Sequence, residues 1–418
     1  MLQQEHHDSD NLMKKINKVI AYIVVALSAL YYHPYIESSP SNALFIRITL
    51  FVLVAISFVI SFRLKTIKSQ KPLKIWVIAA ILVGLQALFL YGLGISDDYI
   101  ESVKALFFTL FSVVIGYSLN LNDGEYKLLI VLYSISLAIS GVSQIFTNFG
   151  GFVIESRYAD FAKNSFGPML TTCIIASLYL HKDLSGWKKV ALIALNTLNI
   201  FILVTIRARA SMVILLFVAT LLFTLKIIRE KYNEKHIITS ILIISISFVL
   251  ATTIFQDTFI NIGEYVYKSF FINTEFGVDI TSGRTERNAI AINTFFEHPF
   301  FGLLGTNTEI PWIHNYPLLV LSSYGIIGGF FLLTFYIYFS IWLLKQVYYK
   351  NILYPTNAGY ICALSLIMSS LAEPTFPYLP GSAVVFTYFL LGICFSKDSI
   401  HITNEKKHSH SYANIPRP

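Results

Sequence analysis

The sequence predicts an all-α polytopic membrane protein with about twelve transmembrane helices and one large loop late in the chain. Its 418 residues are 55% hydrophobic and 13% charged, and the mean hydropathy is +0.63. An ordinary soluble domain is about 25% charged. A hydrocarbon core about 30 Å thick needs about 20 apolar residues per helix, and runs of roughly this kind recur along the chain with short connections. Residues 256–312 form the one long stretch that contains no such run.

The first predicted span is residues 19–32, which follow a basic cluster around Lys14. This arrangement resembles a signal sequence, but no cleavage site of the small-x-small type precedes Tyr31, so we expect the segment to remain as the first helix. The other predicted spans are residues 43–62, 75–93, 105–119, 128–146, 165–180, 190–206, 210–228, 237–255, 324–344, 358–371 and 382–395.

Lysine and arginine in the short loops indicate the orientation, because cytoplasmic loops are enriched in these residues. The basic loops follow the second, sixth and eighth spans and fall on one side, whereas the opposite loops carry acids such as Glu37 and Asp97. We therefore predict that the basic side and both termini are cytoplasmic. The chain then divides into spans one to nine (1–255), an extracytoplasmic loop with the catalytic segment (256–315), spans ten to twelve (316–398) and a cytoplasmic tail (399–418).

The formal charge of +7 does not indicate a nucleic-acid partner, because the basic residues are scattered over short loops instead of forming a stripe interleaved with aromatics. Membrane lipids are the expected surroundings. Cys173, Cys362 and Cys394 all lie inside predicted spans and lack the C-x-x-C spacing of a metal site. We expect them to be buried as small apolar residues.

Arg207 and Arg209 lie between the seventh and eighth spans, where almost no loop separates two helices on the extracytoplasmic side. Two cations placed so closely require an anion or carbonyl partners. They could bind lipid head groups or helix carbonyls, or they could form a phosphate site, for which the planar guanidinium is suited.

The loop itself has helical periodicity. Residues 264–271 alternate aromatic and polar side chains and predict an amphipathic stretch on the membrane surface. Ser282 is a candidate cap for a helix over residues 285–297, which His298-Pro299 should end. The apolar residues at helical spacing in this helix are Ala289, Ile292 and Phe296.

Arg284 and Arg287 lie one turn apart at the start of this helix and should share a face. His314 follows, at the beginning of an apolar helix. A histidine there could be a structural cap, or it could be a general base, because imidazole exchanges a proton near physiological pH. The spacing alone leaves both roles open.

His314-Asn315, followed after nine residues by Gly325 and then by Gly328, reproduces the H-[NSQ]-x9-G-x-x-G pattern of bacterial O-antigen ligases and related O-antigen polymerases. The sequence resembles this family over essentially its whole length. The further matching positions are Lys163-Asn164, Ala208-Arg209-Ala210-Ser211, Ser282-Gly283-Arg284, Asn293, Phe296 and the run from His298 to Gly302.

The resemblance implies a metal-independent, inverting glycosyltransferase without a cofactor, located in the bacterial inner membrane with its active site facing the periplasm. The donor would be a glycan on undecaprenyl diphosphate. By position, Arg209 and Arg284 would hold the diphosphate and His314 would deprotonate the acceptor hydroxyl; Arg207, Arg287 and Asn315 join them as candidate substrate-binding residues. Arginine donors facing a developing negative charge stabilise such a transition state.

The acceptor stays open. A ligase would use lipid A core in lipopolysaccharide biosynthesis, and a polymerase would use a lipid-linked repeat unit. The match between His314 and Gly328 favours the ligase slightly. A transporter for lipid-linked sugars is the competing class, but such folds usually contain internal repeats and ionisable groups near the bilayer midplane. No repeat is evident here, and the candidate residues gather at one membrane face.

Overall fold

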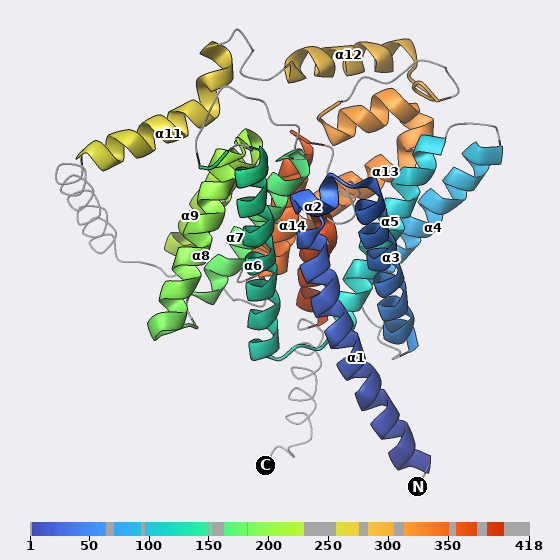
Figure 1. Ribbon diagram of the computed structural model, residues 1–418. Coiled ribbons are helices and arrows are strands. Elements are labelled where there is room, and N and C mark those ends of the chain that lie inside the picture. The colour runs from blue at the N-terminus through green and yellow to red at the C-terminus, as the bar shows by residue number, and fades with distance from the viewer. Residues whose placement is uncertain are drawn as a thin grey trace, which may run out of the picture.

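The computed structural model describes residues 2–63, 71–92, 97–148, 150–152, 163–181, 183–229, 256–275, 283–304, 313–350, 357–373 and 383–396. Across these ranges the regular secondary structure is helical (Figure 1). The helices are α1 (Leu2–Leu30), α2 (Pro34–Glu37), α3 (Pro40–Arg63), α4 (Lys71–Gly92), α5 (Asp97–Ser118), α6 (Asp123–Asn148), α7 (Lys163–Leu180), α8 (Gly186–Thr205), α9 (Arg209–Arg229), α11 (Gln256–Glu275), α12 (Arg284–Glu297), α13 (Tyr316–Tyr349), α14 (Ala358–Ser370) and a final helix, Ala383–Ser396.

Each predicted span that falls within the described ranges coincides with a helix, while the ninth span, residues 237–255, lies outside them. Six of the described helices are long and apolar enough to cross a membrane: α3, α4, α6, α8, α9 and α13. The chain is therefore a helical, multi-pass membrane protein. The total of twelve spans and the orientation remain predictions.

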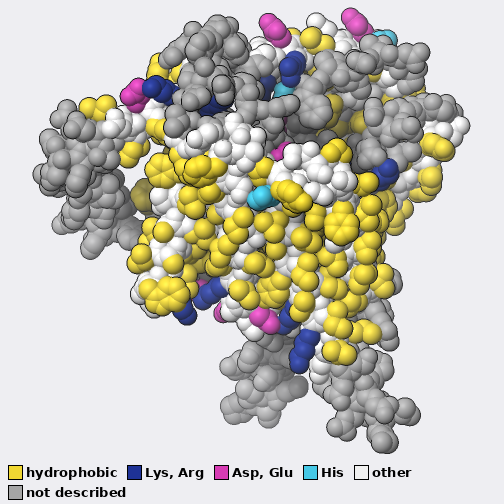
Figure 2. Space-filling view, in the orientation of Figure 1, with side chains coloured by type: hydrophobic (Ala, Val, Ile, Leu, Met, Phe, Trp, Pro, Cys, Tyr) yellow, Lys and Arg dark blue, Asp and Glu magenta, His cyan; other side chains and the backbone are white. Residues whose placement is uncertain are grey.

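The surface of the bundle supports the same conclusion. Large apolar side chains are exposed on its helices, with Phe45 at 67%, Leu88 at 70% and Leu216 at 70% exposure. Figure 2 shows this apolar belt, with charged side chains gathered at its two ends. Contiguous apolar surface of this extent is unfavourable in water and suits a lipid environment.

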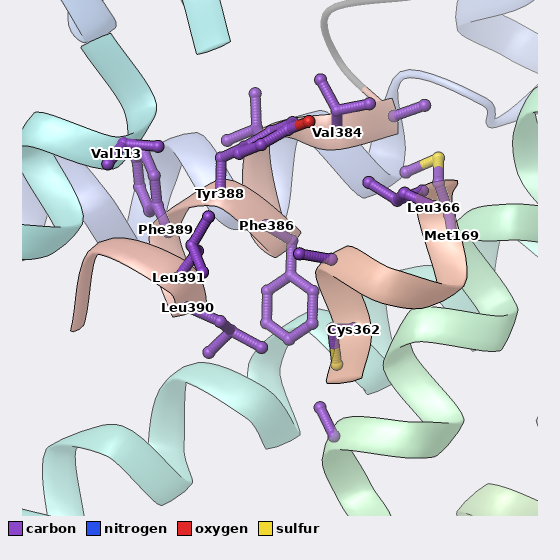
Figure 3. Close-up of a cluster of buried hydrophobic side chains, with 14 of the residues drawn as sticks. Val113, Met169, Cys362, Leu366, Val384, Phe386, Tyr388, Phe389, Leu390 and Leu391 are labelled. Carbon is purple, nitrogen blue, oxygen red and sulfur yellow. The ribbon is translucent and has the colours of Figure 1, made fainter. Parts of the chain in front are cut away.

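The last two helices form the centre of the bundle. Every residue from 383 to 395 is buried, and α14 packs against α7, α9 and α13. Figure 3 shows Phe386, Phe389 and their apolar neighbours in this core. The final helix lies so close to α5 that a Cβ at Gly392 would collide with the Val113 carbonyl oxygen. Only glycine fits at this contact.

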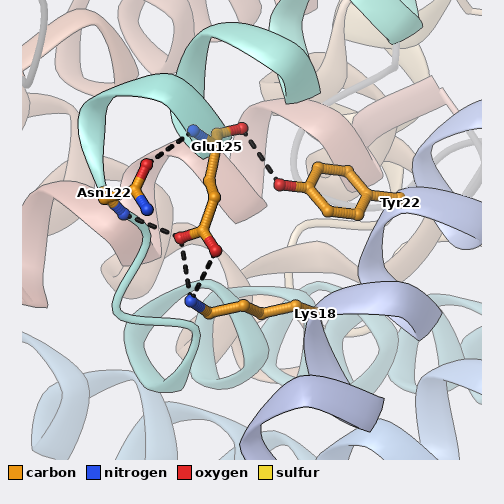
Figure 4. Close-up of polar contacts among 4 residues, drawn as sticks. All are labelled: Lys18, Tyr22, Asn122 and Glu125. Carbon is orange, nitrogen blue, oxygen red and sulfur yellow. Dashed lines mark hydrogen bonds and ion pairs between the residues drawn. The ribbon is translucent and has the colours of Figure 1, made fainter.

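At one end of the bundle, α1 is fastened to the start of α6 (Figure 4). The backbone N–H groups of Asn122 and Glu125 each donate to the other's side chain at 2.9 Å, which is the reciprocal arrangement of a capping box. Lys18 Nζ lies 2.8 Å from both Glu125 carboxylate oxygens, and the Tyr22 hydroxyl donates to the Glu125 carbonyl at 3.2 Å. We call these four residues the α1–α6 clamp.

At the other end, α12 lies across the top of the bundle in Figure 1. The predicted helix is present, and it ends at Glu297 before His298 as expected. Its N-cap, however, is Gly283 in a left-handed conformation (φ 74°), so Ser282, which lies outside the described residues, is not the cap.

The apolar stripe at helical spacing in α12 is not the face of the helix that packs. Ala289, Ile292 and Phe296 are exposed, Phe296 at 73%, and the buried residue is Ala291. α12 crosses the end of the bundle and packs on α13, and this apolar stripe lies on its exposed side.

Candidate active site

The turn that follows α12 is joined to α13 by backbone hydrogen bonds. α13 is interrupted at Gly325, where the backbone leaves the helical conformation (φ 65°, ψ −169°). This break frees N–H and carbonyl groups that an unbroken helix would use internally. The resulting pairs are Ile326 N to Pro299 O (2.8 Å), Ile327 N to Phe300 O (2.8 Å) and Leu303 N to Ser322 O (3.0 Å).

Gly325 is required at this junction for two reasons. Its positive φ is rarely adopted by other residues, and a Cβ here would collide with the Phe300 carbonyl. Gly302, on the facing turn, has φ 59° and an equally close approach to α13. Gly325, the first glycine of the His314–Gly328 pattern, therefore allows the turn after α12 to pack directly against α13.

Asn315 joins the beginning of α13 to the end of α14. Its side-chain oxygen accepts from Leu318 N at 3.1 Å as the N-cap of α13, and its Nδ2 donates to Leu371 O at 3.0 Å. Just beyond, Glu373 N donates to Ser369 O at 2.7 Å. These bonds place the side chains of residues 314 and 373 next to each other.

Four side chains from three segments meet at this junction, and we call them the outer cluster: Arg284, Arg287, His314 and Glu373. His314 Nδ1 lies 2.8 Å from Glu373 Oε2, and Arg287 Nη1 lies 2.9 Å from His314 Nε2. Arg284 Nη2 pairs with the other carboxylate oxygen of Glu373.

These contacts assign the histidine tautomer. A guanidinium has only donors, so Nε2 of His314 must accept from Arg287 and carries no proton. Nδ1 then carries the proton and donates it to the Glu373 carboxylate. A carboxylate on Nδ1 orients the imidazole and stabilises the imidazolium that forms when Nε2 takes a proton. In this arrangement, Nε2 is the nitrogen of His314 that could accept a proton.

The cluster is largely enclosed. His314 is 8% and Glu373 4% exposed, whereas the Arg284 side chain is 29% exposed. A buried carboxylate is costly unless it is paired, and here each oxygen has a partner. Among these four described side chains, two guanidiniums and one carboxylate give a net positive charge, which favours an anionic ligand.

Arg207 and Arg209 occupy the turn between α8 and α9, as the sequence indicated. Arg207 is 6% exposed and has φ 56°, a conformation that costs a non-glycine residue on the order of 1 kcal/mol. Arg209 begins α9, and its Nη1 donates to Phe270 O of α11 at 3.2 Å. The described contact of Arg209 is therefore with α11.

A second contact binds α11 to the same turn, because Tyr265 and Thr205 share a hydrogen bond between their hydroxyls. The predicted amphipathic stretch 264–271 is part of α11. Between α11 and α8 lies an apolar groove lined by Phe152, Leu198, Phe201, Asn261, Ile262 and Tyr265. The groove is thus connected to the turn through Tyr265.

Of the predicted site residues, the structure brings together Arg284, Arg287 and His314. Asn315 lies beside them and uses its side chain for the two helix ends. Glu373 was missed by sequence analysis, because it lies 59 residues from His314. One signal was available: Glu373 is the only acidic residue between Glu309 and Asp398, at the end of an apolar span, where an ionisable side chain indicates function.

Comparison with known proteins gave no match, either to a protein-family model or to a curated protein sequence.

Proposed function

We propose that this protein is a metal-independent membrane glycosyltransferase that moves a glycan from undecaprenyl diphosphate to an acceptor hydroxyl, the chemistry implied by its resemblance to O-antigen ligases and polymerases. The observation that carries the proposal is the pairing of His314 with Glu373 beside two arginines. A base with a carboxylate behind it and cations around it suits a reaction that removes a proton and releases a phosphate.

In the proposed step, Nε2 of His314 takes the acceptor's hydroxyl proton while the acceptor oxygen bonds to the anomeric carbon. The bond from that carbon to the diphosphate oxygen breaks, and its electron pair leaves with undecaprenyl diphosphate. Attack opposite to the leaving group inverts the anomeric centre. Glu373 stabilises the imidazolium, and Arg284 is placed to interact with the charge on the leaving diphosphate.

A lipid-linked donor is supported by two further features. The bundle has an apolar belt, and the apolar groove between α8 and α11 is connected to the turn that carries Arg207 and Arg209. A polyprenyl chain in this groove would bring its diphosphate to these arginines. For the acceptor we favour lipid A core, with a lipid-linked repeat unit as the alternative.

The decisive experiment uses the full-length protein in liposomes with an undecaprenyl-diphosphate glycan and each acceptor in turn. We expect glycan transfer and release of undecaprenyl diphosphate, insensitive to chelators and abolished in His314→Ala. Transfer only to lipid A core would identify a ligase, and transfer only to the lipid-linked unit a polymerase. If normally folded protein transfers to neither acceptor and releases no diphosphate, the proposal is wrong.

The location of the site is proposed to be the periplasmic face of the inner membrane. A reporter that is active only in the periplasm should be active when fused after Asp279 and silent when fused after Lys68. The reverse pattern would exclude the proposed orientation.

A further inference from the structure

The geometry points to a second role for Arg287: it masks the lone pair of His314 Nε2, and an anion that takes its guanidinium unmasks the base. This inference deepens the proposed function, on which it depends for the identity of the anion. It makes donor binding precede deprotonation of the acceptor.

The masking follows from the bonding capacity of imidazole. A neutral imidazole has one nitrogen lone pair in its ring plane available to accept a proton. In His314 that lone pair is on Nε2, and Arg287 Nη1 donates to it at 2.9 Å. The same lone pair cannot receive the proton of an acceptor hydroxyl or of water while this bond is in place. Arg287 must therefore move before His314 can act.

The two arginines of α12 contact different kinds of group in the outer cluster. Arg284 is paired with the charged carboxylate of Glu373, whereas the described partner of Arg287 is a neutral ring nitrogen. The bond from Arg287 to His314 has one ionised member, and a phosphate oxygen would add the attraction between two opposite charges. A diphosphate that enters the site would therefore compete with the ring nitrogen for this guanidinium.

The exchange couples the base to the donor. Nε2 is masked while no donor is bound, and it becomes available to the acceptor's proton once a diphosphate has taken the Arg287 guanidinium. Once Arg287 is bound to the diphosphate, its guanidinium remains with the leaving group as the carbon–oxygen bond breaks, and the acceptor's proton moves to Nε2. Arg287 thus first blocks the base and then stabilises the leaving diphosphate.

The test measures the availability of Nε2 directly and needs no glycan. Diethyl pyrocarbonate reacts with an imidazole nitrogen that has a free lone pair, adding an ethoxycarbonyl group and releasing ethanol and carbon dioxide. The rate at His314 would be followed by mass spectrometry of its peptide in the full-length protein. The exposed His298, at the end of α12, serves as the internal reference.

We expect Arg287→Met to react about tenfold faster than the natural protein at His314, because methionine retains much of the arginine's cover but cannot donate a hydrogen bond. Arg284→Met is the matched control one turn away and should change this rate less than twofold. Inorganic pyrophosphate should accelerate the reaction in the natural protein and have no such effect in Arg287→Met.

Three results would overturn the masking role: an unchanged rate in Arg287→Met, acceleration in Arg287→Ala alone, which would indicate steric cover, or equal acceleration in Arg284→Met. Failure of pyrophosphate to accelerate the natural protein would overturn the unmasking by an anion. These outcomes are independent of the glycosyltransferase assay. A protein that shows masking but transfers no glycan would disprove the proposed function and leave the role of Arg287 intact.

Discussion

The α1–α6 clamp and the outer cluster both bring a basic side chain to a glutamate from a distant part of the chain, but they use the carboxylate differently. In the clamp, Glu125 accepts from Lys18 and from the backbone N–H of Asn122, and its backbone accepts from Tyr22. In the outer cluster, the two described contacts of the Glu373 carboxylate are with the side chains of Arg284 and His314.

We infer from this difference that the clamp is a structural ion pair and that the outer cluster belongs to the proposed active site. Glu125 completes the N-terminal cap of α6 and joins α1 to α6 through Lys18, so the role of its carboxylate is structural. Glu373 contacts a ring whose other nitrogen is the proposed base, and a second guanidinium donates to that nitrogen. Changes in the outer cluster should therefore affect chemistry, and changes in the clamp should affect stability.

His314→Ala should produce the largest effect. If Nε2 is the general base, its loss should lower the glycan-transfer rate about 10²- to 10⁴-fold while donor binding is retained. Transfer and donor binding are measured separately on purified protein in liposomes. A near-normal transfer rate, or a loss explained entirely by misfolding, would show that the outer cluster is structural like the clamp.

Arg284→Lys should be the next most severe change. Lysine keeps the positive charge but loses the planar fork that binds two oxygens at once. The lost charge-assisted bond predicts a fall in kcat/KM of about 10- to 100-fold, seen mainly as a raised KM for the donor. Full activity in both Arg284→Lys and Arg284→Ala would remove this arginine from the proposed diphosphate site.

Glu373→Gln should have a smaller effect that identifies a positioning residue. The amide oxygen can still accept from His314 Nδ1, so the tautomer is kept, but the charge that stabilises the imidazolium is lost. We expect kcat to fall about tenfold with little change in the KM of the acceptor. An unchanged kcat would mean that Glu373 only neutralises Arg284.

The sequence allowed much of this arrangement to be predicted, and what it missed has physical reasons. Apolar runs located the six described helices that are long and apolar enough to cross a membrane, because burial in lipid leaves a strong and local pattern. The spacing of Arg284 and Arg287 placed them on one helical face. The partnership of His314 with Glu373 depends on how two helix ends meet, through Asn315 and Leu371. No local pattern contains that contact. Periodicity also showed the apolar stripe of α12 but could not show which face of that helix packs on α13.

The smallest effect is expected for Glu125→Gln in the α1–α6 clamp. The glutamine oxygen can still accept from Asn122 N, but the ion pair with Lys18 is lost. This ion pair is weak, because the Lys18 and Glu125 side chains are 24% and 30% exposed and solvent screens their charges. We expect the free energy of unfolding to fall by no more than about 1 kcal/mol, measured by thermal unfolding in detergent, with glycan transfer unchanged within about twofold. Lys18→Met is the matched partner variant, and the double variant should be less destabilised than the sum of the two single changes, because both remove one interaction. A loss of transfer larger than the loss of folded protein would show that the clamp communicates with the outer cluster, and the division between a structural and a reactive glutamate would then be wrong.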